Sequence, residues 1–101
     1  MIWSPTAIIH LARLRDFLLE RDSSSAERAR DAIKDGVRML DELPHIGRPV
    51  PDEDGDVRDW LIDFGRKGYK VRYLYENGEV TILAVRHMRE SEFYPARIPD
   101  A

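Results

Sequence analysis

The stretch YKVRYLYENGEVTILAVRH, residues 69–87, decides the fold of this chain. Two runs rich in β-branched and aromatic residues flank the dipeptide Asn77-Gly78. Both of these turn residues tolerate the positive φ angles of a type I′ turn, which is the preferred connection of a tight β-hairpin. The stretch therefore predicts a hairpin with strands over 69–76 and 79–87.

A two-residue turn also determines which side chains share a face of the hairpin, because side chains alternate between faces along a strand. We expect one face to pack against helices, with the pairs Tyr75–Val80, Tyr73–Ile82 and Val71–Ala84. The opposite face should be open, with the pairs Leu74–Thr81, Arg72–Leu83 and Lys70–Val85. That face is half apolar and half basic, which suits a binding partner.

Upstream of the hairpin, the sequence predicts two helices over 5–43. Ser4 and Pro5 provide an N-cap and a first helical residue, and apolar residues then recur every three or four positions. The first helix should end near Arg21-Asp22, and Ser24 to Glu27 indicate a capping box that starts the second. Helices joined by so few residues run antiparallel, and their shared apolar face needs a sheet to cover.

The whole chain of 101 residues is expected to form a single domain. Residues 44–56 hold prolines, glycines and an acidic cluster, and they predict a surface loop. A first strand over 57–64 joins the hairpin in a mainly antiparallel sheet of three to four strands over 57–88. Residues 89–101 form a C-terminal tail. The predicted class is α+β, with the N-terminal helical hairpin packed on this sheet.

The composition is that of an ordinary globular protein, with 43% hydrophobic and 35% charged residues. No apolar run is long enough to span a membrane and no signal-peptide pattern is present, so we expect a soluble cytoplasmic protein. The absence of cysteine excludes disulfides and thiolate chemistry. Because His10, His45 and His87 lack the spacing of metal ligands, we expect neither a metal nor a cofactor.

The sequence contains no self-contained catalytic motif. Nucleophilic triads, phosphate-binding glycine loops and paired-histidine motifs are all missing. Arg66, Lys67, Lys70 and Arg72 follow one another with no intervening acid. Such a run favours an acidic protein segment or a phosphate backbone as partner, unless it is only the solvated rim of the sheet.

Several segments, in this order, resemble the RelE/ParE toxin superfamily. They are Ile2 to Ala7, the helical hairpin, Leu43 to Pro49, Gly68 to Tyr73 and Ile82 to Arg89. The resemblance covers nearly the whole chain, and L-P-x-I-G-R-P followed by a late V-x-H-x-R is fairly specific in combination. It implies a toxin of a bacterial type II toxin–antitoxin pair, of the plasmid-stabilization kind. A small antitoxin would silence it by wrapping across the helical hairpin and the sheet.

The resemblance implies one of two activities, because the superfamily has two branches. RelE-like members cleave mRNA in the ribosome with basic strand residues and a C-terminal tyrosine. ParE-like members poison DNA gyrase and have no known catalytic residue set. Alignment on Gly68 puts Leu61 and Asp63 where RelE-like members have strand lysines, and Met88 where they have a catalytic arginine. These departures argue against RNA cleavage.

Part of the RelE-like residue set survives. Lys70 retains a positive charge where an arginine is expected, and Tyr94 matches the tyrosine. Arg86 or Arg89 could compensate for the missing arginine by a small shift. A RelE-like ribosome-dependent endoribonuclease that uses these residues is therefore one alternative, and a non-toxic antitoxin-binding module is another.

The leading prediction is a non-enzymatic ParE-like toxin with no catalytic residues. It would inhibit DNA gyrase or another type II topoisomerase and form a hetero-oligomeric complex with a ParD-like antitoxin. The net charge of −3 argues against direct contact with nucleic acid. The candidate antitoxin-binding residues are Lys70, Arg72, Leu74 and Leu83. The candidate target-binding residues are Arg86, His87, Arg89 and Tyr94.

Overall fold

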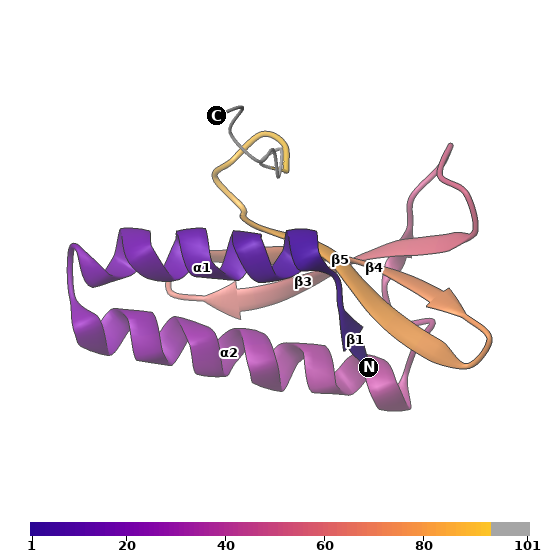
Figure 1. Cartoon of the computed structure of the whole chain (residues 1–101), viewed down its shortest axis with the longest axis horizontal. Helices are drawn as coiled ribbons and strands as arrows, with labels where there is room; N and C mark the ends of the chain where they lie inside the picture. Colours follow the sequence, from indigo (N-terminus) through magenta and orange to yellow (C-terminus); the bar gives the residue numbers. More distant parts are fainter. Residues whose placement is uncertain (94–101) are drawn as a thin grey trace.

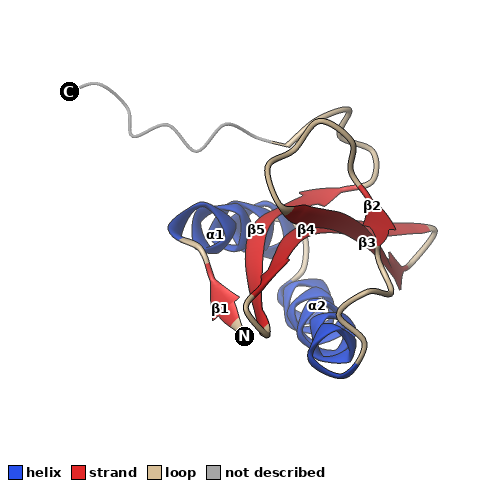
Figure 2. Ribbon diagram, turned by 90° about the vertical axis from the view of Figure 1, so that its right-hand side faces the viewer, coloured by secondary structure: helices blue, strands red, loops and turns tan. Residues whose placement is uncertain are grey.

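Two helices cover one face of a five-stranded sheet (Figures 1 and 2). The computed structural model describes residues 1–93. The elements in chain order are β1 (Ile2–Trp3), α1 (Pro5–Leu19), α2 (Ser23–Glu42), β2 (Arg48–Pro49), β3 (Asp56–Phe64), β4 (Lys67–Glu76) and β5 (Glu79–His87). The strand order is β1-β5-β4-β3-β2, in which β1 runs parallel to β5 and the other pairs are antiparallel. The predicted α+β class is confirmed, and two-residue edge strands extend the predicted sheet.

The first helix begins as the sequence predicts, but the second does not. The Ser4 hydroxyl oxygen accepts a hydrogen bond from the Ala7 amide at 3.1 Å, and Pro5 is the first residue of α1. The N-cap of α2 is Asp22, whose carboxylate accepts from the Ser24 amide at 3.1 Å. The predicted capping box that starts at Ser24 is therefore wrong. The reason is that the Asp22 carboxylate, two residues earlier, accepts the hydrogen bond of a free backbone amide. Its negative charge is also favourable at the positive end of the helix dipole.

The hydrophobic core lies between the helices and one face of the sheet, which we call the helix face. Small residues on α2, Ala26 and Ala29, are buried and permit close packing of the two helices. The larger buried side chains come from both layers: Ile33, Val37 and Leu40 of α2, and Val71, Tyr73, Ile82 and Val85 of the sheet. The helical hairpin thus buries its apolar stripe as the sequence predicts.

The β4–β5 hairpin has the predicted turn but only part of the predicted register. Asn77 and Gly78 both have positive φ, at 52° and 76°. The pairs Tyr75–Val80, Tyr73–Ile82 and Leu74–Thr81 are confirmed. Beyond them β5 contains a bulge at Leu83, so that the pairs become Arg72–Ala84, Val71–Val85 and Lys70–Arg86. The predicted partners Leu83 for Arg72, Ala84 for Val71 and Val85 for Lys70 are therefore wrong by one residue.

The bulge is stabilised by the N-terminal segment and α1, which lie along the outer edge of β5. The Ser4 amide donates to the Ile82 carbonyl at 2.9 Å, and the Ser4 hydroxyl donates to the Leu83 carbonyl at 3.1 Å. The Val85 amide donates to Nδ1 of the buried His10 at 3.1 Å. The extra residue reverses the face of the sheet to which the following side chains of β5 point. Val85 therefore lies in the core and Ala84 lies on the opposite face.

The turn after α2 is anchored to the sheet by one tyrosine. The Tyr73 hydroxyl donates to the Pro44 carbonyl at 2.8 Å and accepts from the Gly47 amide at 2.9 Å. A Cβ atom at Gly47 would lie 2.6 Å from the Tyr73 hydroxyl, so this close approach requires glycine. Arg58 also donates to the His45 and Gly47 carbonyls at 3.0 Å. The L-P-x-I-G-R-P segment therefore has a structural role at the sheet.

Candidate functional site

The face of the sheet opposite the helices, which we call the open face, carries most of the candidate residues. Paired residues of neighbouring strands point to the same face, so the register assigns its members. They include Asp59, Leu61 and Asp63 of β3, Lys70, Arg72 and Leu74 of β4, and Ala84 and Arg86 of β5. The structure thus brings Arg86, a predicted target-binding residue, beside Lys70, a predicted antitoxin-binding residue.

Arg72 is surrounded by groups that balance its charge. Its guanidinium donates two hydrogen bonds to the Asp59 carboxylate, at 2.9 and 3.0 Å, and lies 3.6 Å from a carboxylate oxygen of Glu53. The hydrogen bond to Asp59 raises the pKa of Arg72 above its usual value. The Phe93 ring lies over the guanidinium, with its centroid 4.7 Å from Cζ. Arg72 therefore contributes little net positive charge to the open face.

Lys70 and Arg86 in the middle of the sheet, together with Arg48 on the edge strand β2, provide the remaining positive charge of this face. Lys70 is half-buried between Leu61 of β3 and Arg86 of β5, and within residues 1–93 no ion pair of its ammonium group is found. Arg86 donates hydrogen bonds to the carbonyls of His87 and Glu90. Since carbonyls carry no net charge, no carboxylate of the described residues balances the charge of either side chain, which suits an acidic partner.

The structure separates the other candidates from this pair. Leu74 lies beneath the loop that precedes β3, because a Cβ atom at Gly55 would be 3.0 Å from its Cδ1. Leu83 occupies the bulge and opposes no residue of β4. His87 is on the helix face, with its ring edge-on to Tyr69 at 5.4 Å, and Arg89 follows the end of β5. Tyr94 falls outside the described residues.

Sequence reasoning missed the acidic partners of Arg72. The predicted strands over 57–64 and 69–76 leave four residues for the turn between them, which is wrong: Phe64 pairs with Lys67, so only Gly65 and Arg66 form the turn. A two-residue loop gives the pair Asp59–Arg72 by direct counting, and Gly65 has the positive φ of 61° that such a turn needs. The glycine turn that sets the Asp59–Arg72 pair is therefore visible in the sequence. The contact between Phe93 and Arg72 is not, because it depends on the path of the chain after β5.

The described part of the chain shows neither a metal site nor a membrane span. No group of three or more histidine, cysteine, aspartate or glutamate side chains within residues 1–93 is arranged to hold a metal ion. Neither of its two helices is long and apolar enough to cross a membrane.

Two comparisons with known proteins agree with this geometry. The family model described as "ParE toxin of type II toxin-antitoxin system, parDE" matches residues 1–92. The protein named Toxin RelE3, from Caulobacter vibrioides, is 33% identical over 86 residues, which cover 85% of this chain and 90% of that protein. The chain thus belongs to the ParE toxin family, within the RelE/ParE superfamily of type II toxin–antitoxin toxins.

Proposed function

We propose that this toxin acts by binding DNA gyrase rather than by cleaving RNA, and that a ParD-like antitoxin neutralises it. The observation that carries the proposal is the composition of the open face. Asp59 balances Arg72 there, and Leu61 and Asp63 occupy the exposed positions of β3 where the RNA-cleaving branch has lysines. An RNA phosphate on this face would meet the Asp63 carboxylate as well as Lys70 and Arg86, and that carboxylate would repel it.

Within residues 1–93, the open face carries no histidine. General acid–base catalysis at neutral pH needs a side chain that can exchange a proton with the substrate, most often histidine. Among residues 1–93, the ionisable side chains that the register and the Arg72 contacts place on the open face are lysine, arginine, aspartate and glutamate. His87 faces the other side of the sheet. This arrangement supports inhibition by protein binding, with Lys70 and Arg86 at the contact.

One observation favours the second candidate, a RelE-like ribonuclease. Lys70 and Arg86 are direct cross-strand neighbours, and two adjacent cations can stabilise a phosphate that gains charge during cleavage. The relative from Caulobacter vibrioides also bears the name RelE3. The test of the proposal therefore measures both activities on the same preparation.

The purified chain should inhibit the supercoiling of relaxed plasmid by gyrase and cause cleaved linear plasmid to accumulate. The same preparation should leave mRNA intact on programmed ribosomes. We expect Arg86→Glu to weaken the inhibition about tenfold, because it reverses a cation at the proposed contact. Arg66→Glu makes the same charge change in the exposed β3–β4 turn and should have little effect.

Cleaved mRNA with normal supercoiling would overturn the proposal in favour of the ribonuclease. Absence of both activities, in a chain that still binds its antitoxin, would overturn it in favour of a non-toxic module. Equal losses of inhibition for Arg86→Glu and Arg66→Glu would contradict the placement of the contact on the open face.

For the antitoxin we propose an interface on the open face that is centred on Lys70, with Arg72, Leu74 and Leu83 at its margin. Lys70→Glu should slow the association with an acidic antitoxin segment about fivefold to tenfold and change the dissociation rate less, because an unpaired cation mainly steers encounter. Stopped-flow or surface-plasmon measurements at low salt would give both rates. If Lys70→Glu associated with the antitoxin as fast as the control variant Arg66→Glu, this interface would be contradicted.

A further inference from the structure

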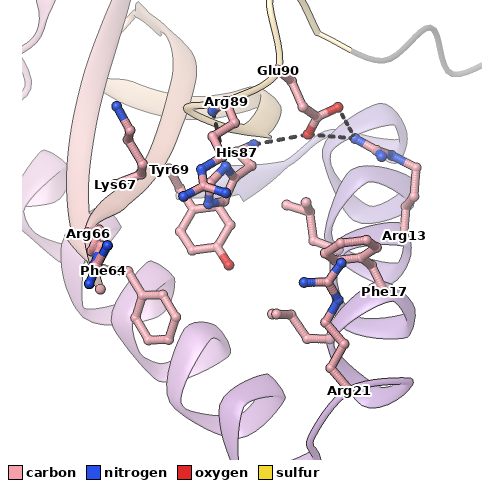
Figure 3. Close-up of a pocket in the computed structure, with 13 residues that line it drawn as sticks. Arg13, Phe17, Arg21, Phe64, Arg66, Lys67, Tyr69, His87, Arg89 and Glu90 are labelled. Atoms are coloured by element: carbon pink, nitrogen blue, oxygen red, sulfur yellow. Dashed lines mark hydrogen bonds and ion pairs between the residues drawn. The ribbon is translucent and has the colours of Figure 1, made fainter.

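A pocket with a volume of about 540 Å³ opens between α1 and the end of the sheet (Figure 3). We call it the α1 pocket. Its apolar walls come from Leu14, Phe17 and Leu18 of α1 and from Phe64 and Tyr69 of the sheet. This size is within the range of pockets that hold small organic ligands. The pocket lies on the helix face and is therefore separate from Lys70 and Arg86 on the open face.

The charged residues around the α1 pocket are almost all cations. They are Arg13, Arg21, Arg66, Lys67 and Arg89. Glu90 is the one acid among the lining residues described. Both of its carboxylate oxygens accept from the Arg13 guanidinium, at 2.9 and 2.7 Å, and one also accepts from the His87 amide at 3.1 Å. The acid is thus already engaged, and the pocket retains an excess of positive charge that favours an anion.

Tyr69 places a polar group at the base of the pocket. The residue is only 2% exposed, and its ring packs against Phe64 at 5.9 Å and against His87 at 5.4 Å. Figure 3 shows its hydroxyl pointing into the space between the sheet and α1. Within the described chain this hydroxyl makes no hydrogen bond. Burial raises its pKa, so it remains a donor at neutral pH. Although the ring is buried, the hydroxyl oxygen itself is reached by solvent in the pocket, so it can donate to an acceptor that a ligand supplies.

Aromatic and guanidinium planes lie beside one another at the mouth of the pocket. The Arg21 guanidinium stacks on the Phe17 ring, with Cζ 4.4 Å from the centroid, and the Phe17 side chain is half exposed. A flat ring can stack on such a surface, whereas an aliphatic chain gains no comparable contact. The arginines can at the same time bind phosphate oxygens in pairs.

We propose that the α1 pocket binds a small ligand that joins a phosphate group to an aromatic ring, as a nucleoside phosphate does. Arg89 and Lys67 bind the phosphate oxygens at the rim, Tyr69 donates a hydrogen bond from the base, and the ring stacks on Phe17. The proposal is independent of gyrase inhibition, because the two sites lie on opposite faces of the sheet.

Adenosine 5′-diphosphate is a suitable probe for calorimetric titration of the whole purified chain. We expect Arg89→Gln to weaken its binding about tenfold, since one charge-assisted hydrogen bond is lost. Tyr69→Phe should weaken it about fivefold without altering the fold, because the hydroxyl bonds to no described residue. Arg48→Gln changes an exposed arginine of β2, on the open face, and should bind the probe like the unaltered chain.

Any of four outcomes would overturn the proposal. The first is no measurable binding of adenosine 5′-diphosphate at millimolar concentration. The second is equal binding of inorganic diphosphate, which would remove the role of the aromatic ring. The third is binding that neither Arg89→Gln nor Tyr69→Phe weakens, which would place the nucleotide elsewhere. The fourth is binding of an acidic peptide at Arg89 without binding of the nucleotide, which would show that the pocket binds a protein segment and not a small ligand.

Discussion

Replacement of Gly68 by alanine should lower the free energy of unfolding by about 3 kcal/mol or more, or prevent folding. Gly68 has φ of 131°, a conformation that side chains with a Cβ atom rarely adopt. A Cβ atom there would lie 2.0 Å from the Ile62 carbonyl oxygen. Because that oxygen belongs to the backbone of β3, relief of the clash requires the two strands to separate.

Gly65→Ala is the matched control for this prediction. Gly65 lies in the same turn with φ of 61°, and no atom is within 4 Å of the Cβ that alanine would add. The free energy of unfolding of Gly65→Ala should fall only by the cost of placing alanine in the left-handed conformation, about 1 kcal/mol. Urea unfolding followed by circular dichroism would give both values. Equal losses for the two variants would show that β3 and β4 do not approach as closely at Gly68 as the structure indicates.

The Gly68 variant should also affect the open face, because Gly68 is bonded to the end of β5. The Gly68 carbonyl accepts a hydrogen bond from the Met88 amide at 2.9 Å. A displaced backbone at Gly68 would therefore move the strand ends that carry Lys70 and Arg86. If Gly68→Ala still folds at low temperature, the proposed inhibition of gyrase should fall more for this variant than for Gly65→Ala.

Val85→Asp should be the second most damaging change, with a loss of more than about 3 kcal/mol. Val85 is fully buried in the core, opposite Val71 of β4. A carboxylate there would have no partner other than apolar side chains and would be either desolvated or forced to take up a proton. The loss should show in urea unfolding and be smaller at acidic pH, where the carboxyl is neutral.

Leu83→Asp provides the control, because it places the same charge in the same strand. Leu83 is half-buried in the bulge, so its variant should lose only about 1 kcal/mol. The simple register without a bulge predicts a different result, since it puts Val85 on the open face. A tolerated Val85→Asp would contradict the bulge and with it the placement of Arg86 beside Lys70.

The positions of most candidate residues depend on the β4–β5 register. The sequence therefore predicts the residues of the regular part of the hairpin but not those beyond the bulge. Lys70 and Arg72 were correctly assigned to the open face, because they lie on the regular side of the hairpin. Arg86 was predicted to bind a target at the end of its strand, but its position next to Lys70 depends on the bulge. The charge balance of Arg72 by Asp59 does not follow from the predicted strands over 57–64 and 69–76, because they make the β3–β4 turn two residues too long.

The sequence by itself determined the elements whose signals are local. The Ser4 N-cap, the apolar stripes of the helices and the turn at Asn77-Gly78 each depend on residues within a few positions of one another. Such signals specify helices, strands and turns directly, because the groups that satisfy the backbone are already neighbours in the chain.

Only the tertiary structure decided the bulge at Leu83 and the α1 pocket. The bulge exists because Ser4 and His10, more than 70 residues away in the chain, bond the groups of β5 that it frees. The pocket likewise requires α1, the β3–β4 turn and the segment after β5 to meet. Contacts of this kind are set by how the layers pack, so no short stretch of sequence contains both partners.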